Sequence, residues 1–359
     1  GFSSLASNVI LADLDDRPDA AERQVRALSS FKLNHPVGEE VEYCNLNYNV
    51  LGLIIEAASG EPYADYIQKH IFNPLGMSYS YSSKSSAQQA GLAMGYRHWF
   101  GIPFPAANLP IPHGSLASGQ LISCAEDMAH YLIAHLNGGL YRKAQILSAA
   151  GMDELQRGEK EYLPFGISAG RYAMGWFDKE IDHTRTLTHG GNVPDFSAFM
   201  SLVPGQKKGL VLLLNADPYG LPMITDEIGT NLTAILAGHP PEPIKLDFIQ
   251  WIFRFLPLIP LLQLWSVIAT LEKVNQWQRN PVNRPGIGKL CFQHILIPLI
   301  PNLSLAAALA YLRSSRLLNF MNLYMPDLAW IARISGGFAS IWAFWRTRIV
   351  LNAIRKPRL

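Results

Sequence analysis

The stretch EYCNLNYNVLG, residues 42–52, opens an apolar run and carries a tyrosine and two asparagines at its start. The run has helical periodicity and stops at Gly60, a residue type that commonly ends helices. An asparagine is favoured at a helix start because its side chain satisfies backbone N–H groups that the first turn leaves unpaired. Capping by Asn45 and plain packing of Tyr43 are therefore one interpretation, but they leave the Tyr-x-Asn pair itself unexplained.

Charge is distributed unevenly along the chain. Residues 1–240 contain 16 Lys and Arg against 24 Asp and Glu, whereas residues 241–359 contain 14 against 4. A basic segment indicates a nucleic acid or a membrane as its partner. This segment is also the apolar part of the chain, so we expect a lipid bilayer and no nucleic acid.

Several classes of site find no support in the sequence. The cysteines Cys44, Cys124 and Cys291 are far apart and show no spacing typical of a zinc site or a disulfide framework. The histidines are scattered, and no glycine-rich phosphate-binding motif occurs. We therefore expect no metal and no cofactor.

The order of elements in the first two thirds of the chain indicates an α+β fold. Helical patterns come first, and residues 171–178, 196–204 and 209–217 then have the composition of strands. The turn at 205–208 should join the last two strands as an antiparallel hairpin, and a helix at about 223–236 should close the unit. Helices followed by an antiparallel sheet are typical of α+β domains.

The rest of the chain resembles a membrane region. We expect a first domain at 1–237, a Pro-rich linker at 238–250 and an all-α membrane region at 251–359. Three apolar stretches have about the length needed to cross a bilayer, and they are 251–271, 290–312 and 328–345. Lys and Arg are most frequent in the loop 272–289 and after the third stretch. Basic residues near membrane ends stay in the cytoplasm, so we expect a multi-pass membrane protein with a cytoplasmic C-terminus and an extracytoplasmic first domain.

Five motifs then occur in the order known from one hydrolase family. Tyr43-Cys44-Asn45-x-x-Tyr48-x-x-x-Gly52 resembles the Tyr-x-Asn segment of the serine β-lactamase and penicillin-binding-protein-like hydrolases of the class C type. The other matches are Asn73-Pro74-Leu75-Gly76-Met77, Ser123-x-Ala125-Glu126-Asp127-Met128, Gly175-Trp176, and His189-Gly190-Gly191 with Asn215 at the end of a later strand. The resemblance implies a β-lactamase-like antiparallel sheet with a helical subdomain.

The resemblance also implies catalytic roles for the opening motif. Members of the family transfer acyl groups through a serine that a neighbouring lysine and tyrosine deprotonate, because a serine hydroxyl is a poor nucleophile by itself. Tyr43 would be the partner in proton transfer, and Asn45 would hold the substrate amide.

The later motif would complete the site. His189 would lie beside the carboxylate or leaving group of the substrate, in the place of the commoner lysine. Gly190 and Gly191 would let the substrate approach the strand closely, and the backbone N–H of Asn192 would form half of the oxyanion hole. The His-Gly-Gly run also resembles an α/β-hydrolase oxyanion loop, but that fold needs a G-x-S-x-G elbow, which this chain lacks.

No residue of the chain fits the nucleophile. The Ser-x-x-Lys at 29–32 lies only 14 positions before Tyr43 and at the C-terminal end of its predicted helix, where the helix dipole disfavours a developing oxyanion. In addition, residues 1–4 resemble the end of the family segment that follows the true Ser-x-x-Lys. We therefore expect the N-terminal part that carries the nucleophile to be missing from this sequence.

These observations lead to two hypotheses on function. The first is a membrane-anchored serine hydrolase that acts through an acyl-enzyme on an amide, ester or β-lactam, with a peptidoglycan-derived peptide as one option, and that is inactive as this fragment. The alternative is a non-catalytic, membrane-anchored binding or sensor protein with a β-lactamase-like fold. A transporter built on the membrane region is disfavoured, because the apolar stretches hold few polar groups and no repeat.

Overall fold

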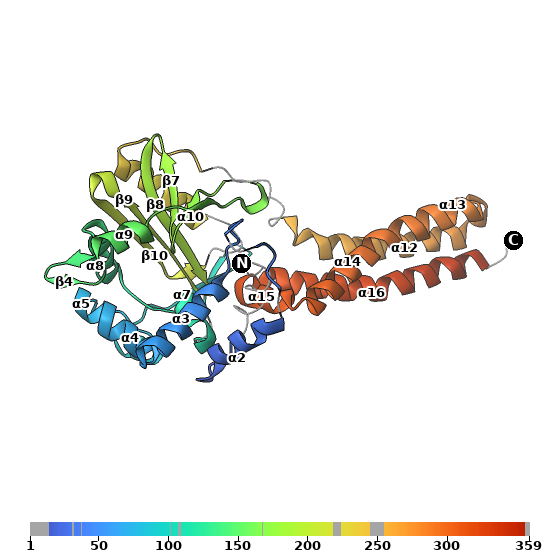
Figure 1. Cartoon of the computed structure of the whole chain (residues 1–359). Coiled ribbons are helices and arrows are strands. Elements are labelled where there is room, and N and C mark those ends of the chain that lie inside the picture. The colour runs from blue at the N-terminus through green and yellow to red at the C-terminus, as the bar shows by residue number, and fades with distance from the viewer. Residues whose placement is uncertain are drawn as a thin grey trace. The chain divides into compact units, whose positions relative to one another are not determined.

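The computed structural model divides the chain into two compact units, residues 1–245 and 246–359 (Figure 1). The end of the expected linker, 245–250, and the first four residues of the first expected membrane span lie outside the described residues. The structure describes residues 14–30, 32–36, 38–100, 102–106, 109–166, 168–217, 224–244 and 255–355.

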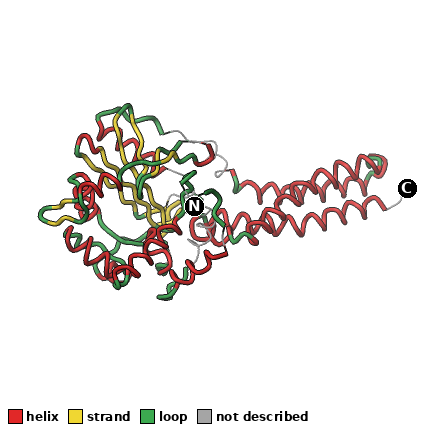
Figure 2. The backbone as a smooth tube through the Cα atoms, in the orientation of Figure 1, coloured by secondary structure: helices red, strands yellow, loops and turns green. Residues whose placement is uncertain are grey.

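The first unit is built on a sheet, drawn in yellow in Figure 2. This sheet is antiparallel and has six strands in the order β10-β9-β8-β7-β6-β5. Its strands are β5 (Lys160–Glu161), β6 (Arg171–Tyr172), β7 (Phe177–Ile181), β8 (Thr184–Val193), β9 (Phe196–Val203) and β10 (Lys208–Leu214). The predicted hairpin is formed by β9 and β10, with Lys207 at φ 51° in the turn that joins them. The predicted α+β fold with an antiparallel sheet is confirmed.

Helices cover both faces of this sheet, and the side chains of β8 alternate between them as the pleat of a strand requires. Leu187 is fully buried against Leu132 of α8 (Ala125–Leu136). On the other face, α10 (Ile224–Ala237) lies so close to β9 that a side chain at Gly229 would collide with the ring of Phe199. The two faces are therefore distinguished by the helix that packs on each.

The helical subdomain precedes the sheet in the chain. A π-helical turn at Gln68–Phe72 lies directly before Pro74, because a proline cannot donate to the preceding turn and its ring crowds the carbonyl four residues earlier. The helices are α2 (Ala20–Ala27), α3 (Asn45–Ser59), α4 (Tyr63–Ile67), α5 (Asn73–Leu75), α6 (Lys84–Gln89), α7 (Leu116–Gly119), α8 and α9 (Ala149–Leu155). The short strands β1 (Tyr96–Trp99), β2 (Ile102–Pro105) and β11 (Ala216–Asp217) form a second sheet, and β3 (Leu140–Tyr141) pairs with β4 (Ala144–Gln145).

The second unit consists of helices in its described part. A continuous helical segment from Ile287 to Ser314 contains α13, a π-helical turn before Pro298, and α14. Its close packing against α16 (Pro326–Arg355) depends on Gly336, where a Cβ would lie 2.6 Å from the Cβ of Leu309. The helices are α12 (Leu258–Arg279), α13 (Ile287–Cys291), α14 (Ile297–Ser314), α15 (Leu317–Tyr324) and α16 (Pro326–Arg355).

The helices differ in extent from the expected membrane spans. The stretch 290–312 lies within Ile287–Ser314, which is the one helix in the described part of the chain that is long and apolar enough to cross a membrane. The first helix runs on to Arg279, so the expected loop 272–289 is partly helical. The expected loop 313–327 contains α15, and 328–345 is part of a 30-residue helix. Helix ends also depend on packing, which a hydropathy pattern does not contain, so these helices can extend beyond the expected spans.

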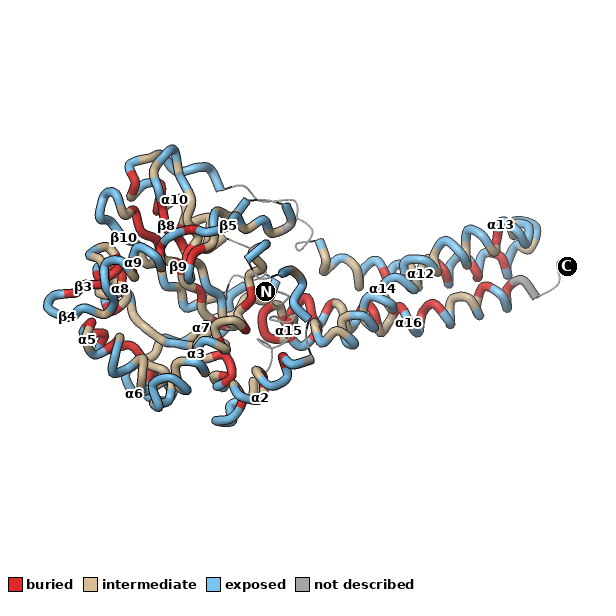
Figure 3. Tube along the Cα trace, viewed as in Figure 1, coloured by how far each residue is buried: buried red, intermediate tan, exposed pale blue. Residues whose placement is uncertain are grey.

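Buried and exposed positions alternate along the helices of the second unit (Figure 3). Large apolar side chains point outward, including Leu262, Trp265 and Ile300, which are each more than 60% exposed. Large apolar residues such as Trp277, Leu290 and Trp342 are buried between the helices. Polar or small residues are buried beside them, and these are Gln263, Thr270, Asn302, Asp327, Ala329, Ser335, Ala339, Ala343 and Ala353.

Candidate active site

The Tyr-x-Asn motif lies at the entrance to α3. Cys44 occupies the N-cap position with extended backbone (φ −149°) and is buried, and Asn45 is the first helical residue. The Tyr43 hydroxyl donates to Oδ1 of Asn45 at 3.2 Å. The Asn45 side chain therefore does not serve as the N-cap of α3, and its amide is held against the tyrosine hydroxyl.

The other residues of this motif hold α3 in place. A Cβ at Gly52 would lie 2.7 Å from the Cβ of Ala117, so only glycine lets α7 pack this closely on α3. One turn after Tyr43, the hydroxyl of Tyr48 lies 2.5 Å from the hydroxyl of Tyr172 on β6. The motif thus connects the helical subdomain with the sheet.

The Gly175-Trp176 motif opens the edge of β8. The backbone turns sharply between β6 and β7, with Gly175 at φ 85° and the N–H of Ala173 bonded to the carbonyl of Trp176 at 2.8 Å. Trp176 is buried in the core next to Leu187. Because of this turn, β7 begins only at Phe177 and pairs with β8 no further than Thr188, and residues 189–193 pair with β9 alone.

The three motif residues on this open edge face different surroundings. His189 lies across the ladder from Met200, on the face of the sheet that packs on α8. Gly190 faces α10, where an added Cβ would lie 2.1 Å from Oδ1 of Asp226. Gly191 and Asn192 are exposed, and a Cβ at Gly191 would meet nothing within 4 Å. The edge is accessible at 191–192, while a side chain at Gly190 would displace the carboxylate of Asp226 behind the strand.

An aromatic cluster brings the two motifs together. It consists of Tyr43, Tyr162, Tyr172, Phe177 and His189, with Tyr43 at its centre. The ring centroid of Tyr43 lies 5.9 Å from that of Tyr172, 6.3 Å from Phe177 and 6.1 Å from His189. His189 in turn stacks on Phe177 at 5.7 Å. Offset and edge-to-face contacts at such distances are favourable, so the cluster fixes the position of the tyrosine relative to the strand.

Burial in the cluster shifts the proton equilibria of both motif residues. Burial is the main cause that raises the pKa of Tyr43 to about 12, and the phenols of Tyr48 and Tyr162 add to it. Burial also lowers the pKa of His189 below its usual value. At neutral pH the site therefore holds a protonated phenol and a neutral imidazole. Both can donate and accept hydrogen bonds without carrying charge.

The sequence motifs did not identify every residue of the aromatic cluster. Tyr162, Tyr172 and Phe177 come from segments whose pattern indicates only strands and turns. Behind β8, burial raises the pKa of Asp226 and lowers that of Lys179, and each charge partly offsets the shift of the other. The sequence places Asp226 near the start of a predicted helix, but it does not show that this carboxyl group approaches the backbone at Gly190.

The rejected nucleophile candidate lies outside the cluster. Ser29 is exposed, and its hydroxyl donates to the carbonyl of Arg26 in its own helix at 2.9 Å. Lys32 is exposed as well. Residues 1–4, which also entered the prediction about the nucleophile, lie outside the described residues.

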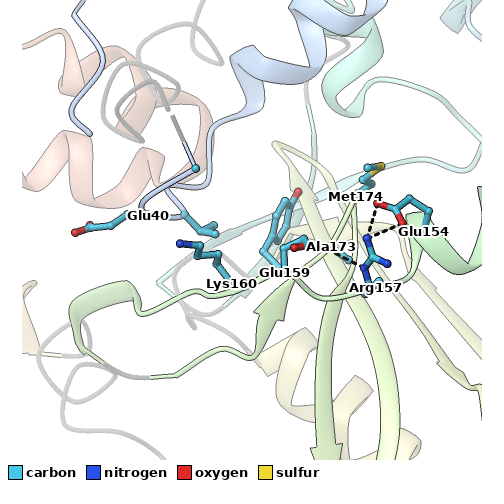
Figure 4. Close-up of a pocket in the computed structure, with 10 residues that line it drawn as sticks. Glu40, Glu154, Arg157, Glu159, Lys160, Ala173 and Met174 are labelled. Atoms are coloured by element: carbon cyan, nitrogen blue, oxygen red, sulfur yellow. Dashed lines mark hydrogen bonds and ion pairs between the residues drawn. The ribbon is translucent and has the colours of Figure 1, made fainter. Parts of the chain in front are cut away.

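A cavity of about 270 Å³ lies next to the cluster and shares Tyr172 with it (Figure 4). Its charged groups have partners. Arg157 forms ion pairs with Glu154 at 2.6 Å and Glu159 at 2.9 Å, and the carboxylate of Glu40 lies 3.4 Å from Nε2 of His35. Lys160 donates to the carbonyl of Glu39 at 3.1 Å. The cavity therefore presents no unsatisfied acid or base, and it is a weaker candidate for chemistry than the edge of β8.

The comparisons with known proteins agree on the family. The Beta-lactamase family model matches residues 3–234. Protein flp of Staphylococcus aureus strain MW2 is 29% identical over 210 residues, or 58% of this chain. The unguisins hydrolase ungD' of Aspergillus campestris is 27% identical over 201 residues, or 54% of this chain. The chain spans only about 40% of the length of the first protein and 36% of the second.

Solved structures show the same fold. The octameric penicillin-binding protein homologue from Pyrococcus abyssi has a TM-score of 0.50 and 24% identity, with 72% of this chain and 69% of that chain covered. D-amino acid amidase from Ochrobactrum anthropi SV3 has a TM-score of 0.51 and 20% identity, with 65% and 70% covered. With the family model matching most of the chain and the motifs assembled around Tyr43 and β8, this protein belongs to the Beta-lactamase family of serine hydrolases.

Proposed function

We propose that the protein is a membrane-anchored serine hydrolase that transfers an acyl group from an amide, ester or β-lactam. The observation that carries this proposal is the position of Tyr43, bonded to Asn45 and packed beside His189 at the unpaired edge of β8. A substrate backbone lying along 189–193 would find unpaired strand groups. The N–H of Asn192 would stabilise the oxyanion, and Asn45 would hold the substrate amide.

In this proposal Tyr43 needs a cation beside it to become a base. Its pKa of about 12 keeps the phenol protonated at neutral pH. A nearby positive charge favours the phenolate and would lower that pKa. A Ser-x-x-Lys motif would supply both groups: its lysine would carry this charge, and its serine, one turn earlier, would carry the nucleophilic hydroxyl. We propose that this motif comes from a segment outside the 359 residues, and that these residues alone do not form an acyl-enzyme.

Labelling with a fluorescent penicillin tests the catalytic proposal. The 359-residue chain should take up no covalent label, whereas a chain extended upstream to include a Ser-x-x-Lys should be labelled. In that extended chain, Tyr43→Phe should slow acylation about 10²–10⁴-fold, because positioned proton transfer is lost. If the 359-residue chain is labelled, and Ser29→Ala abolishes that labelling, the proposal that the nucleophile lies outside these residues is wrong. An extended chain that stays unlabelled but binds the penicillin reversibly would favour the binding or sensor function.

The exposed apolar side chains of the second unit support the membrane anchor. Large apolar side chains on the outside suit lipid tails, and small or polar residues between helices are typical of packing in membranes. Gln263, for example, is buried and donates to the backbone carbonyl of Ser335 at 2.9 Å. We propose that α12, Ile287–Ser314 and α16 all span the bilayer. Packing between the helices would stabilise α12 and α16 in the membrane.

The distribution of basic residues sets the proposed orientation. Lys and Arg gather where α12 ends, α13 begins and α16 ends, so this end should be cytoplasmic and the hydrolase unit extracytoplasmic. An enzyme so placed would meet peptidoglycan-derived or other extracytoplasmic acyl substrates. A reporter active only in the cytoplasm should be on when fused after Leu359 and off when inserted after Arg316. The opposite pattern would refute the orientation.

A further inference from the structure

The cytoplasmic end of the helical unit begins with an apolar cluster between three helices. This cluster consists of Val274 and Trp277 of α12, Leu290 of α13, and Val350 and Ala353 of α16. Trp277, Leu290 and Val350 are all buried. The three helices are thus in contact at this level.

One turn deeper, each helix carries a nitrogen-bearing side chain. Lys273 lies four residues before Trp277, His294 four after Leu290, and Arg346 four before Val350. Residues four apart lie on the same face of an α-helix, so Arg346 lies on the face of α16 that carries Val350. Lys273 is exposed beside the buried Val274, and His294 lies in the π-helical turn that follows α13. The ring of His294 packs edge-on against Trp277 at 4.9 Å, and the charges of Arg346 and Lys273 both act on His294.

The two cations of this group, Lys273 and Arg346, lack a protein counter-charge among the described residues. In the described residues no carboxylate lies within ion-pair distance of Lys273 or Arg346. The Nε of Arg346 is shielded from solvent and has no hydrogen-bond partner among those residues. Like charges brought together repel each other, and a buried donor without a partner costs stability. Lys273 is exposed, so the group of cations is open to a ligand from outside.

We propose that Lys273, His294 and Arg346 form a binding site for the phosphate of an anionic phospholipid head group. A phosphate oxygen would accept from Nε of Arg346, a guanidinium being suited to bidentate phosphate binding. Lys273 and the N–H of His294 would complete the site. Basic pockets between membrane helices on the cytoplasmic side bind such head groups, and the exposed apolar side chains of α12 would lie along the acyl chains. This inference rests on the proposed membrane anchor.

The test uses the full chain in nanodiscs of phosphatidylcholine with a minor fraction of phosphatidylglycerol. Native mass spectrometry after mild release should show one retained phosphatidylglycerol. Arg346→Gln should weaken retention about fivefold, since one cation near the membrane surface contributes roughly that factor. The matched control is Arg348→Gln, which removes the same charge from the same helix at an exposed position over the ring of Trp345. It should change little, and Arg346→Lys should retain most binding.

Each alternative outcome is informative. Equal losses for Arg346→Gln and Arg348→Gln, with unchanged helix content by circular dichroism, would show surface electrostatics only and refute the site. Inorganic phosphate could instead bind to the chain in phosphatidylcholine nanodiscs, with an affinity that depends on Arg346, and displace the anionic lipid. This result would show that the ligand is a free anion and would refute the lipid. Failure of the chain to enter nanodiscs of phosphatidylcholine alone would refute the anchor and the lipid with it. Entry without preference for the anionic lipid would refute the site alone.

Discussion

Acid should destabilise the hydrolase unit through one histidine in its core. His135 of α8 is 4% exposed. Its ring packs on Tyr131 at 4.4 Å and edge-on against Trp176 at 5.4 Å, and Nδ1 lies 3.4 Å from the side-chain amide of Gln156. Burial without a counter-charge lowers the pKa of His135 to about 4. The folded state therefore excludes a proton that the unfolded chain binds below a pH of about 6.5.

The sign and size of the effect follow from this difference in pKa. The contribution of neutral His135 to the free energy of unfolding is fully present above the pKa of the unfolded state. It is lost as the pH falls from about 6.5 towards 4, because the unfolded state then binds more protons than the folded state. At 1.36 kcal/mol per pH unit, the loss in free energy of unfolding reaches about 2 kcal/mol at pH 5 and about 3 kcal/mol at pH 4. For a unit of this size, 2 kcal/mol corresponds to roughly 4–8 °C in Tm.

The assay is thermal unfolding of the full chain in detergent, followed by tryptophan fluorescence between pH 8 and pH 5. His135→Asn removes the titrating group, so the loss of Tm on acidification should be about 4–8 °C smaller in this variant than in the wild type. The matched control is His183→Asn, an exposed turn residue with φ 63°, a conformation that asparagine tolerates. Its pH dependence should equal that of the wild type. Identical slopes for His135→Asn and the wild type would refute the reasoning.

Two further predictions concern the site. Gly190→Ala should lower the free energy of unfolding by about 1–3 kcal/mol, because the new Cβ would lie 2.1 Å from Oδ1 of Asp226, whereas Gly191→Ala, with open space around it, should cost at most about 0.5 kcal/mol. Urea titration distinguishes the two, and similar effects would contradict the packing argument. Tyr48→Phe should cost about 1–2 kcal/mol by leaving the partly buried Tyr172 hydroxyl without its partner. Combining it with Tyr172→Phe should cost less than the sum of the single changes, and strict additivity would show that the two hydroxyls do not interact.

Motifs whose meaning is local could be interpreted from the sequence. Tyr43 and Asn45 are two residues apart at a helix entrance, and their hydrogen bond depends on that spacing. The hairpin of β9 and β10 was predictable because a tight turn joins two apolar runs. The apolar stretch at 290–312 was recognisable because length and composition alone decide whether a helix can cross a bilayer.

Other features of the site are decided only by the tertiary structure, because they combine residues that are distant in the chain. The turn at Gly175 ends the pairing of β7 and thereby opens the edge of β8 beside His189. The aromatic cluster around Tyr43 combines the start of α3 with three strands, and its burial sets the pKa of the tyrosine. The spacing of residues along the chain carries no information on such desolvation. In the same way, Lys273, His294 and Arg346 become one group only because three helices meet one turn away. Burial and the approach of like charges are properties of packing, so they appear only when the chain is folded.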